Sequence, residues 1–240
     1  MPENKKPICL VLGGSFNPPT IAHRDLLLEA IETIRRMTGR DVCGCMVPSS
    51  DAYVRRKMAR CKTACETFPE TMRLDMLREL CTGTDLKVSD VEFGDDGAGR
   101  TYEMLCKLRR ENQDYEYRFV VGADKLRIIP RWHEIEKLLG EFGLVVIARN
   151  RTSAKTADLQ IRSEPLLSVY SRNITILDGL DGDMSEFSST SARECFETGD
   201  YDTLSKLCGF SAATMMARYA CTGNRYDGYD AWKKWRHCET

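Results

Sequence analysis

The sequence predicts a doubly wound α/β fold, with a mainly parallel sheet, helices on both of its faces and a small helical region near the C-terminal end. Apolar runs of strand length alternate with helical patterns from residue 8 to residue 178, and this alternation favours parallel strands joined by helices. The informative motifs follow predicted strands, at residues 14–23, 48–57, 122–124 and at Arg149. Since ligands of such sheets bind at the carboxyl ends of the strands, we expect these motifs at one edge of the sheet.

Six short apolar runs predict the strands of this sheet. Pro48 ends the second run, because proline has no N–H to donate to a strand ladder. The run before Gly122 leads directly into a polar turn. The strands are expected, in chain order, at residues 8–12, 42–47, 86–92, 117–121, 143–148 and 173–178.

Stretches with helical periodicity between and after these runs predict the helices. Gly39 closes the first of them as a C-terminal glycine, and Thr67 and Glu70 have the spacing of a capping box for the second. The segments 94–100 and 150–164 are expected to be mobile surface loops. The helices are expected at residues 22–37, 68–81, 101–112, 134–140, 188–198, 201–207 and 211–221.

The C-terminal end is predicted to form a separate aromatic-rich tail over residues 223–240, after a domain over residues 1–222. Aromatic residues recur in the tail at three-residue intervals, at Tyr226, Tyr229, Trp232 and Trp235. One interpretation is a stripe that packs a final helix against the body of the protein. The other is a surface for self-association into a homo-oligomer.

The composition excludes several classes of protein. The 240 residues include 35 Lys and Arg against 36 Asp and Glu, a formal charge of −1, which offers no bulk attraction to nucleic acid or to an anionic membrane. No apolar stretch approaches the roughly 18 residues needed to span a bilayer, and residues 1–6 lack the apolar core of a signal peptide. We therefore expect a cytoplasmic protein without nucleic-acid or membrane partners, with nuclear entry left open at this size.

The eleven cysteines argue neither for disulfides nor for a metal. Their number is odd, and the chain is far longer than the small secreted scaffolds that depend on disulfides. No Cys-x-x-Cys occurs, and the pairs Cys43–Cys45 and Cys61–Cys65 lack the second pair of a zinc site. We expect reduced thiols that pack as small hydrophobes and no resident metal.

The segment 13–23, with the sequence GGSFNPPTIAH, is the most informative part of the chain. It has the order strand, glycine turn and helix start, in which backbone N–H groups and the helix dipole face an anion. His23 lies in the first turn of that helix. The segment is neither a Walker P-loop nor a G-x-G-x-x-G motif, which argues against kinases and dehydrogenases.

A second phosphate-binding element is predicted at residues 187–193, with the sequence FSSTSAR. Hydroxyl groups in the first turn of a helix, followed one turn later by Arg193, make a compact clamp for phosphate. A plain Ser/Thr N-cap would give the same local pattern. The presence of both elements in one chain favours the phosphate interpretation.

Together these two segments resemble the signature of the nucleotidyltransferases that join a mononucleotide to ATP, in which a Gly-Ser-Phe-Asn-Pro turn precedes a Thr/His-x-x-His pair and an Ile-Ser-Ser-Thr-x-x-Arg motif follows. The chain is identified as a member of the nicotinamide/nicotinate mononucleotide adenylyltransferases. This resemblance covers residues from about 8 to 219 and implies a Rossmann-like fold. It also implies adenylyl transfer from ATP to nicotinamide or nicotinic acid mononucleotide, with release of pyrophosphate.

Three weaker matches agree with this resemblance. Residues 47–53 (VPSSDAY) resemble the eukaryotic family's Val-Pro-x-x-Asp-Ala-Tyr, which is followed there by a lysine run, where this chain has Arg55. Residues 122–124 (GAD) match a Gly-x-Asp segment that contacts the ATP ribose and adenine. Trp132 matches a tryptophan that stacks on the pyridine ring.

One position departs from the animal enzymes, which carry a second stacking tryptophan where this chain has residues 91–93 (VEF). Thr101 and Tyr102 instead resemble the bacterial Ser-Tyr-Thr segment. The group that forms the second wall of the pyridine pocket is therefore left open by the sequence.

The resemblance implies a role for each motif. The residues implied to act on the reacting phosphates are His23, Arg193 and Thr20. The residues implied to bind the mononucleotide are Gly14, Ser15, Phe16, Arg55, Thr101, Tyr102 and Trp132. The residues implied to bind ATP are Gly122, Asp124, Ser189 and Thr190. Mg²⁺ is expected to accompany the ATP phosphates, because no dedicated carboxylate cage is visible.

Two alternatives remain at this stage. One is transfer to another acceptor, such as phosphopantetheine, or the use of CTP; residues 122–124 and Trp132 argue against it. The other is a nucleotide-binding or chaperone-like module that lost catalysis, which the presence of His23 and Arg193 disfavours. No residue is diagnostic of the choice between nicotinamide and nicotinic acid substrates.

Overall fold

The computed structural model describes residues 5–60, 67–94, 99–148, 153–178 and 188–230. Within these residues the strands form a six-stranded sheet in the order β3-β2-β1-β4-β5-β6, with parallel pairing throughout. The order reverses between β1 and β4, which is where sheets of this kind bind ligands. The strands are β1 Ile8–Gly14, β2 Val42–Pro48, β3 Lys87–Val88, β4 Glu116–Gly122, β5 Leu144–Ile147 and β6 Ile174–Leu177.

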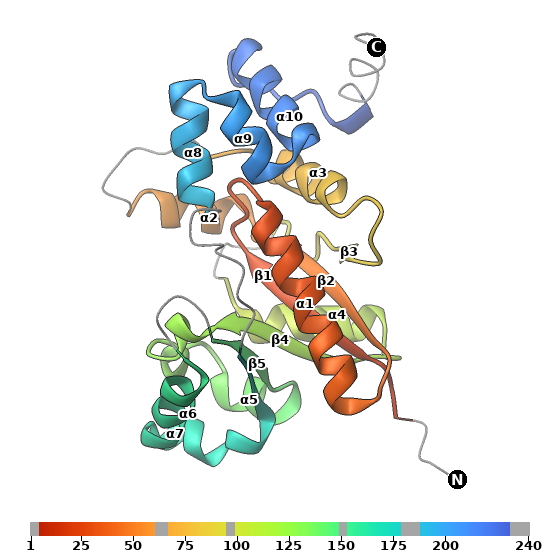
Figure 1. Cartoon of the computed structure of the whole chain (residues 1–240), viewed down its shortest axis with the longest axis vertical. Coiled ribbons are helices and arrows are strands. Elements are labelled where there is room, and N and C mark those ends of the chain that lie inside the picture. The colour runs from red at the N-terminus through yellow and green to blue at the C-terminus, as the bar shows by residue number, and fades with distance from the viewer. Residues whose placement is uncertain (1–4, 61–66, 95–98, 149–152, 179–187, 231–240) are drawn as a thin grey trace.

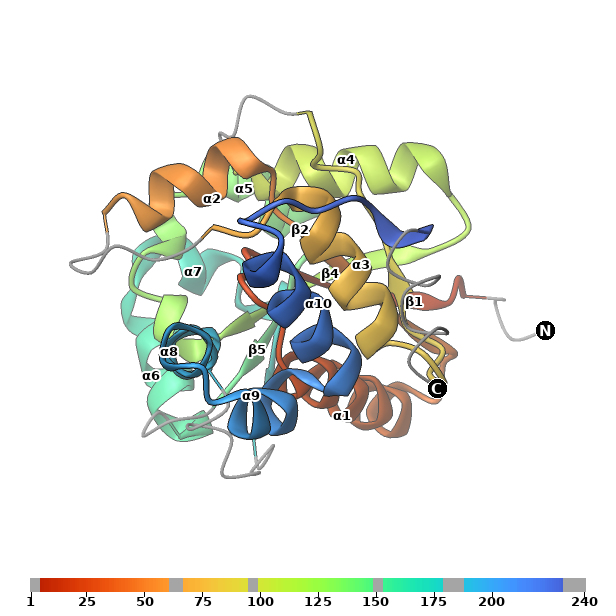
Figure 2. The same cartoon turned by 90° about the horizontal axis from the view of Figure 1, so that it is seen from above.

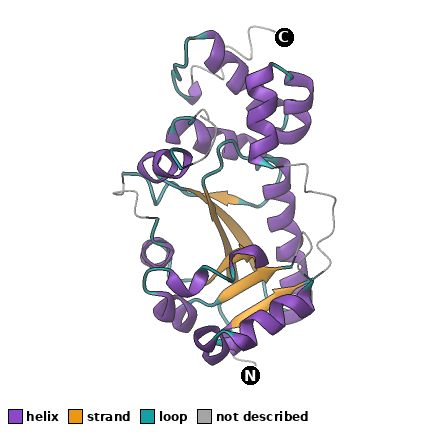
Figure 3. Cartoon of the chain, turned by 90° about the vertical axis from the view of Figure 1, so that its left-hand side faces the viewer, coloured by secondary structure: helices purple, strands orange, loops and turns teal. Residues whose placement is uncertain are grey.

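Helices cover both faces of the sheet (Figures 1, 2 and 3). Helices α4 to α7 pack on one face and α1 on the other. Helices α8, α9 and α10 form a separate layer at the top of Figure 1, beyond the carboxyl end of β1. The helices are α1 Ile21–Thr38, α2 Asp51–Met58, α3 Glu70–Leu80, α4 Thr101–Glu111, α5 Ile135–Glu141, α6 Ala154–Ser163, α7 Pro165–Val169, α8 Ser189–Thr198, α9 Tyr201–Cys208 and α10 Phe210–Cys221.

The core follows from the alternation of side chains along the strands. In β1, Cys9 and Val11 point to the face with α4 to α7, while Ile8 and Leu10 point to the face with α1. Gly44 of β2 allows α1 to approach closely, because a Cβ there would lie 2.7 Å from the Ile31 side chain. The predicted α/β doubly wound fold is confirmed.

Helix α3 lies between two cores. Its Leu77 joins the sheet core under α1, whereas Met72 and Met76 join the core formed with α8, α9 and α10. Phe68, just before the helix, is also fully buried in this second core. Side chains on almost every face of α3 are therefore removed from water, including the charged Arg73.

Three local predictions were wrong. The expected strand 86–92 is only Lys87–Val88, because Ser89 Oγ accepts the Val91 N–H and turns the chain. Helix α3 begins at Glu70 with Pro69 at its N-cap, so Thr67 does not cap it. Residues 153–164 of the expected loop are mostly helical, because Ser153 accepts the Thr156 N–H and Ala157 is buried.

Helix α2 was not predicted from the sequence. It buries only Val54 and Met58, and two apolar positions are too few to give a clear helical periodicity. Several residues named from the sequence lie outside the described part of the chain: Cys61, Cys65, residues 95–98, Arg149, Phe187, Trp232 and Trp235. In the described part of the tail, Tyr226 donates to Asp75 Oδ2 at 2.8 Å and Tyr229 donates to Glu79. This part of the tail therefore lies against α3.

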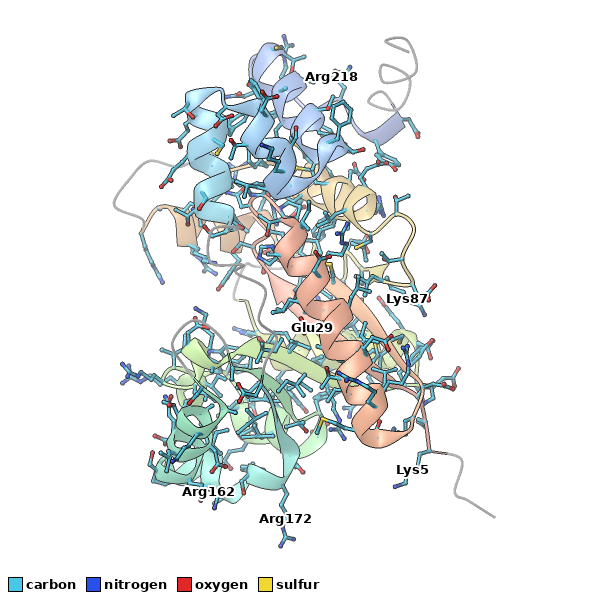
Figure 4. All side chains as sticks on the ribbon, in the orientation of Figure 1. Lys5, Glu29, Lys87, Arg162, Arg172 and Arg218 are labelled. Carbon is cyan, nitrogen blue, oxygen red and sulfur yellow. The ribbon has the colours of Figure 1, made fainter. Side chains whose placement is uncertain are left out.

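The charged side chains are spread over the molecule. Lys5, Arg162 and Arg172 lie towards one end, and Arg218 lies at the other end on α10 (Figure 4). All cysteines among the described residues are free thiols. No described helix has the length and apolarity to cross a membrane.

Candidate active site

The turn after β1 enters the site at the point where the strand order reverses. Its polar residues are removed from solvent: Asn17 and Thr20 are fully buried and Ser15 nearly so. Phe16 adopts a positive φ of 43° and packs edge-on against His23, with ring centroids 5.1 Å apart. A Cβ at position 14 would lie 3.3 Å from the Phe16 ring, so this close approach favours Gly14.

Thr20 and His23 are bonded to each other at the start of α1. The Thr20 backbone N–H donates to His23 Nδ1 at 3.1 Å, and the Thr20 hydroxyl lies 2.7 Å from the same nitrogen. Because Nδ1 accepts the backbone N–H, the proton of the neutral ring lies on Nε2. Thr20 therefore orients the His23 ring, and its buried hydroxyl is directed at that ring.

The two phosphate-binding segments predicted from the sequence lie together. Arg193 Nη1 donates to the Asn17 carbonyl at 2.7 Å, and Ser189 Oγ donates to the Pro18 carbonyl at 2.8 Å. Arg193 Nη2 lies 3.2 Å from the Thr190 hydroxyl. The first turn of α8 thus closes over the turn after β1, across about 170 residues of sequence.

Arg193 combines burial with an unused donor. The residue is 8% exposed, and its buried Nε–H has no acceptor in the described part of the chain. A buried N–H without an acceptor is costly, and a charged donor group is suited to an anion that the protein itself does not supply. Its Nε–H is thus a donor that the described residues leave unused.

Helix α2 contributes Lys57 to the turn, where the sequence analysis implicated Arg55. Lys57 Nζ donates to Ser15 Oγ at 2.9 Å. The Arg55 side chain is 72% exposed and pairs with Asp51 at 3.8 Å. Lys57 was missed because the family's lysine run was matched by order along the chain, while the structure selects the residue that faces Ser15.

Arg73 is the other residue that the sequence analysis missed. It is fully buried, and its guanidinium donates to the Ser15 carbonyl at 2.8 Å and to the Ser49 carbonyl at 2.7 Å. Burial lowers the pKa of Arg73, and the hydrogen bond to Asp51 opposes this shift. The sequence signal for a buried charge was the position of Arg73 between the apolar residues Met72 and Leu74. This signal is weak, because exposed arginines of surface helices have the same neighbours.

The residues implicated in ATP binding on β4 are more open. Gly122 ends the strand, and the Asp124 side chain is 56% exposed and pairs with Lys125 at 2.7 Å. Trp132 is partly buried and packs edge-on against Phe119, with centroids 6.0 Å apart. The Trp132 ring therefore packs against the sheet core on the side of Phe119.

Thr101 and Tyr102 open α4, and the Tyr102 hydroxyl is engaged by α5. It donates to Glu141 at 2.8 Å, and this hydrogen bond raises the pKa of Tyr102. Its ring packs edge-on against Phe142. In the segment 91–93, Glu92 is buried at 8% exposure.

The described residues contain no group of three or more His, Cys, Asp or Glu side chains that could hold a metal ion. The cations around the turn after β1 are instead Lys57, Arg73 and Arg193. Each of these cations is held in place by a hydrogen bond to the turn itself.

A doubly wound parallel sheet with two segments predicted to bind phosphate at its switch point is typical of the nucleotidyltransferases of the α/β class. A family model described as cytidylyltransferase-like matches residues 11–195, and the chain belongs to this family.

Curated relatives agree with this assignment, and a solved structure shares the fold. A probable nicotinate-nucleotide adenylyltransferase of Streptococcus pneumoniae is 31% identical over 156 residues, which are 65% of this chain and 69% of the relative. One of Streptococcus mutans is 30% identical over 65% of this chain and 68% of the relative. The fold matches Plasmodium falciparum nicotinic acid mononucleotide adenylyltransferase complexed with NaAD, with a TM-score of 0.64, 18% identity and coverage of 92% of this chain and 99% of that one.

Proposed function

We propose that the protein transfers the adenylyl group of ATP to a pyridine mononucleotide and releases pyrophosphate. Nicotinate mononucleotide is the expected acceptor, which would give deamido-NAD, and nicotinamide mononucleotide, which would give NAD, is the alternative. The observation that carries the proposal is the closure of Arg193 and Ser189 over the turn that holds His23. The names of the curated relatives support nicotinate mononucleotide.

The reaction is an in-line displacement. The 5′-phosphate of the mononucleotide attacks the α-phosphorus of ATP, one new P–O bond forms, and the bond to the leaving pyrophosphate breaks. The attacking phosphate is an anion at neutral pH, so no general base is needed. Catalysis then consists of orienting the two reactants and stabilising the negative charge of the transition state.

The residues of the turn after β1 act on the reacting phosphates. His23 would donate from Nε2 to a phosphate oxygen, since Thr20 holds its other nitrogen as an acceptor. Arg193 would donate its Nε–H to the triphosphate, with Ser189 and Thr190 in the same helical turn. Thr20 therefore supports the phosphates through His23.

The acceptor would lie between the turn and α2. Lys57 is the better placed partner for its phosphate, and Arg55 would add charge from the exposed side of the helix. Gly14, Ser15 and Phe16 would line the pyridine, which stacks on Trp132, and Thr101 and Tyr102 open the neighbouring helix. Gly122 and Asp124 would bind the adenosine part of ATP.

Mg²⁺ enters as part of the Mg²⁺–ATP substrate. The described residues lack a cluster of carboxylates that could hold the ion on the protein, and Mg²⁺ is commonly bound through substrate phosphates and water. Its role would be to neutralise charge on the triphosphate.

The experiment is to measure pyrophosphate release from Mg²⁺–ATP with nicotinate mononucleotide, nicotinamide mononucleotide and phosphopantetheine, and with CTP in place of ATP. Release with a pyridine mononucleotide and ATP is expected, and the two rates rank the two acceptors. Release only with phosphopantetheine or only with CTP would contradict the proposal. Binding of ATP and a mononucleotide without release would indicate a module that lost catalysis.

A further inference from the structure

Arg73 is the largest side chain that the described structure buries completely, and the proposed reaction does not use it. Moving a guanidinium out of water costs several kcal/mol unless hydrogen bonds replace the lost hydration. Arginine carries five N–H donors in a rigid planar fork and stays charged in proteins. The partners of Arg73 therefore indicate what this buried charge holds in place.

The guanidinium joins three segments of the chain. Its Nε donates to the Phe68 carbonyl at 3.0 Å, its Nη1 to the Ser15 carbonyl at 2.8 Å, and its Nη2 to the Ser49 carbonyl at 2.7 Å. Nη2 also donates to Asp51 Oδ1 at 3.1 Å. Ser15 follows β1, and Ser49 follows β2, so Arg73 ties together the ends of two neighbouring strands.

The same helix also holds the first residue of α2. Glu70 Oε2 accepts the Asp51 backbone N–H at 2.9 Å, while Arg73 binds the Asp51 carboxylate. Glu70 and Arg73 are one turn apart on α3. Together they bind both the backbone N–H and the side chain of Asp51, the first residue of α2. Nearly two turns further along α2, Lys57 donates to Ser15 Oγ.

These contacts form a closed ring. Hydrogen bonds link Arg73 to Ser15, Ser15 to Lys57 and Asp51 to Arg73, and helix α2 itself connects Lys57 to Asp51. The two sides of the ring are the turn after β1 and helix α2, between which the mononucleotide would bind. Arg193 and Ser189 of α8 contact the same turn at the carbonyls of residues 17 and 18, whereas Arg73 contacts it at the Ser15 carbonyl. The ring thus belongs to the acceptor side of the site.

We infer that Arg73 is a positioning residue for the mononucleotide, which fixes the separation between the turn after β1 and α2 so that Lys57 and the turn meet the acceptor phosphate together. This inference rests on the proposed function. It assigns Arg73 no contact with the substrate. Its effect is on the affinity for the acceptor and much less on that for ATP.

The test is the KM of each substrate in Arg73→Lys. Lysine keeps the charge but cannot reach the carbonyls of Ser15, Ser49 and Phe68 together. We expect the KM of nicotinate mononucleotide to rise at least about 10-fold, the effect of one hydrogen bond to a charged group, while the KM of ATP stays within about 2-fold. Arg78→Lys is the matched control, since Arg78 lies on the same helix, pairs with Asp75 at 3.0 Å and is half exposed.

A merely structural role gives a different result. The variant would then melt at a lower temperature and lose active enzyme, so that kcat per total protein falls while both KM values stay unchanged. That result, or an equal rise in both KM values, would overturn the inference. The midpoint of thermal unfolding is measured alongside to identify this case.

A second variant covers the case in which Arg73→Lys does not fold. Within the ring, Asp51→Ala removes only the hydrogen bond between Arg73 and the carboxylate of Asp51, whose side chain is 28% exposed. The three contacts of Arg73 with backbone carbonyls remain. We expect the KM of the mononucleotide to rise about 3- to 10-fold and the KM of ATP to be unchanged. An unchanged KM for the mononucleotide in this variant would contradict the ring.

Direct calorimetry of nicotinate and nicotinamide mononucleotide binding separates this inference from the proposed function. If the wild-type protein binds neither acceptor and releases no pyrophosphate with either, the proposed function fails and the inference fails with it. If the wild-type protein turns over and the two variants bind the acceptor as tightly as it does, only the role of Arg73 is wrong.

Discussion

Two turns leave the same edge of the sheet, each after a strand that ends in glycine, and they are built differently. In the turn after β1, Asn17 and Thr20 are fully buried and Phe16 is 3% exposed. In the turn after β4, Asp124 is 56% exposed and its ion pair is with the neighbouring Lys125. The same local pattern of strand and glycine therefore gives two environments.

The difference comes from the segments that close over each turn. Helices α2, α3 and α8 contribute Lys57, Arg73 and Arg193 to the turn after β1. The contacts of Asp124 are local. A turn that is held from three directions can present fixed donors to a transition state, whereas an exposed turn is suited to adjustable contacts with a ligand. Substitutions in the first turn should therefore affect turnover, and those in the second should affect binding.

The largest effect is expected for His23→Ala. Loss of one donor aimed at the reacting phosphates should lower kcat at least about 100-fold. The measurement is pyrophosphate release at saturating substrates, with unfolding followed by circular dichroism. His133→Ala is the control, since the His133 side chain is half exposed and lies 3.4 Å from Glu103. Near-normal turnover of His23→Ala would rule out its role.

The next effect separates two residues of α2. Lys57→Met removes the cation that contacts Ser15, and we expect the KM of the mononucleotide to rise about 10-fold. Arg55→Met removes an exposed cation and should change this KM by less than about 3-fold, since exposed charges are screened. Steady-state kinetics on both variants decides between them, and the reverse order would mean that Arg55 binds the phosphate, as the family resemblance implies.

A smaller effect is expected on the turn after β4. Asp124→Asn should raise the KM of ATP by about 3- to 10-fold, the value of one modest hydrogen bond, and leave kcat within about 2-fold. Titration of ATP at saturating mononucleotide measures both. A fall in kcat comparable to that of His23→Ala would remove the difference between the two turns.

The smallest effect on turnover, below about 2-fold, is expected for Tyr226→Phe, because Tyr226 supports the first turn only through α3. Burial and the hydrogen bond to Asp75 raise the pKa of Tyr226. A raised pKa means that its contribution to stability is complete below the ordinary tyrosine value of about 10 and is lost as the pH rises above it, since the unfolded chain then releases the proton first.

Urea unfolding at pH 8 and at pH 10.5 measures this contribution. At pH 8, Tyr226→Phe should be about 1.5 kcal/mol less stable than the wild type, and the difference should shrink at pH 10.5. Tyr201→Phe on α9, which has an exposed side chain, is the control. A difference that is constant with pH would show that Tyr226 does not titrate through this contact.

Much of the fold was predictable from the sequence, because the local periodicity of apolar residues differs between strands and helices. The strands near residues 8, 42, 117, 144 and 174 and most helices were found in this way. The wrong predictions fell where a hydrogen bond of a single side chain decided how a strand or a helix begins or ends. Glu70 was read as the partner of Thr67 in a capping box, but it accepts the Asp51 N–H and so caps α2 instead. Such a choice depends on which helix start lies nearby in space.

The sequence by itself determined the α/β class, the glycine turn before the helix with His23, and the hydroxyl-rich helix start with Ser189 and Arg193, because glycine turns, helix starts and hydroxyl-rich caps are short-range patterns. The tertiary structure alone decided that Lys57 faces Ser15 and that Arg73 is buried between two cores. The physical reason is that the burial of a charge depends on distant segments that supply its acceptors. For Arg73 these acceptors come from residues 15, 49, 51 and 68.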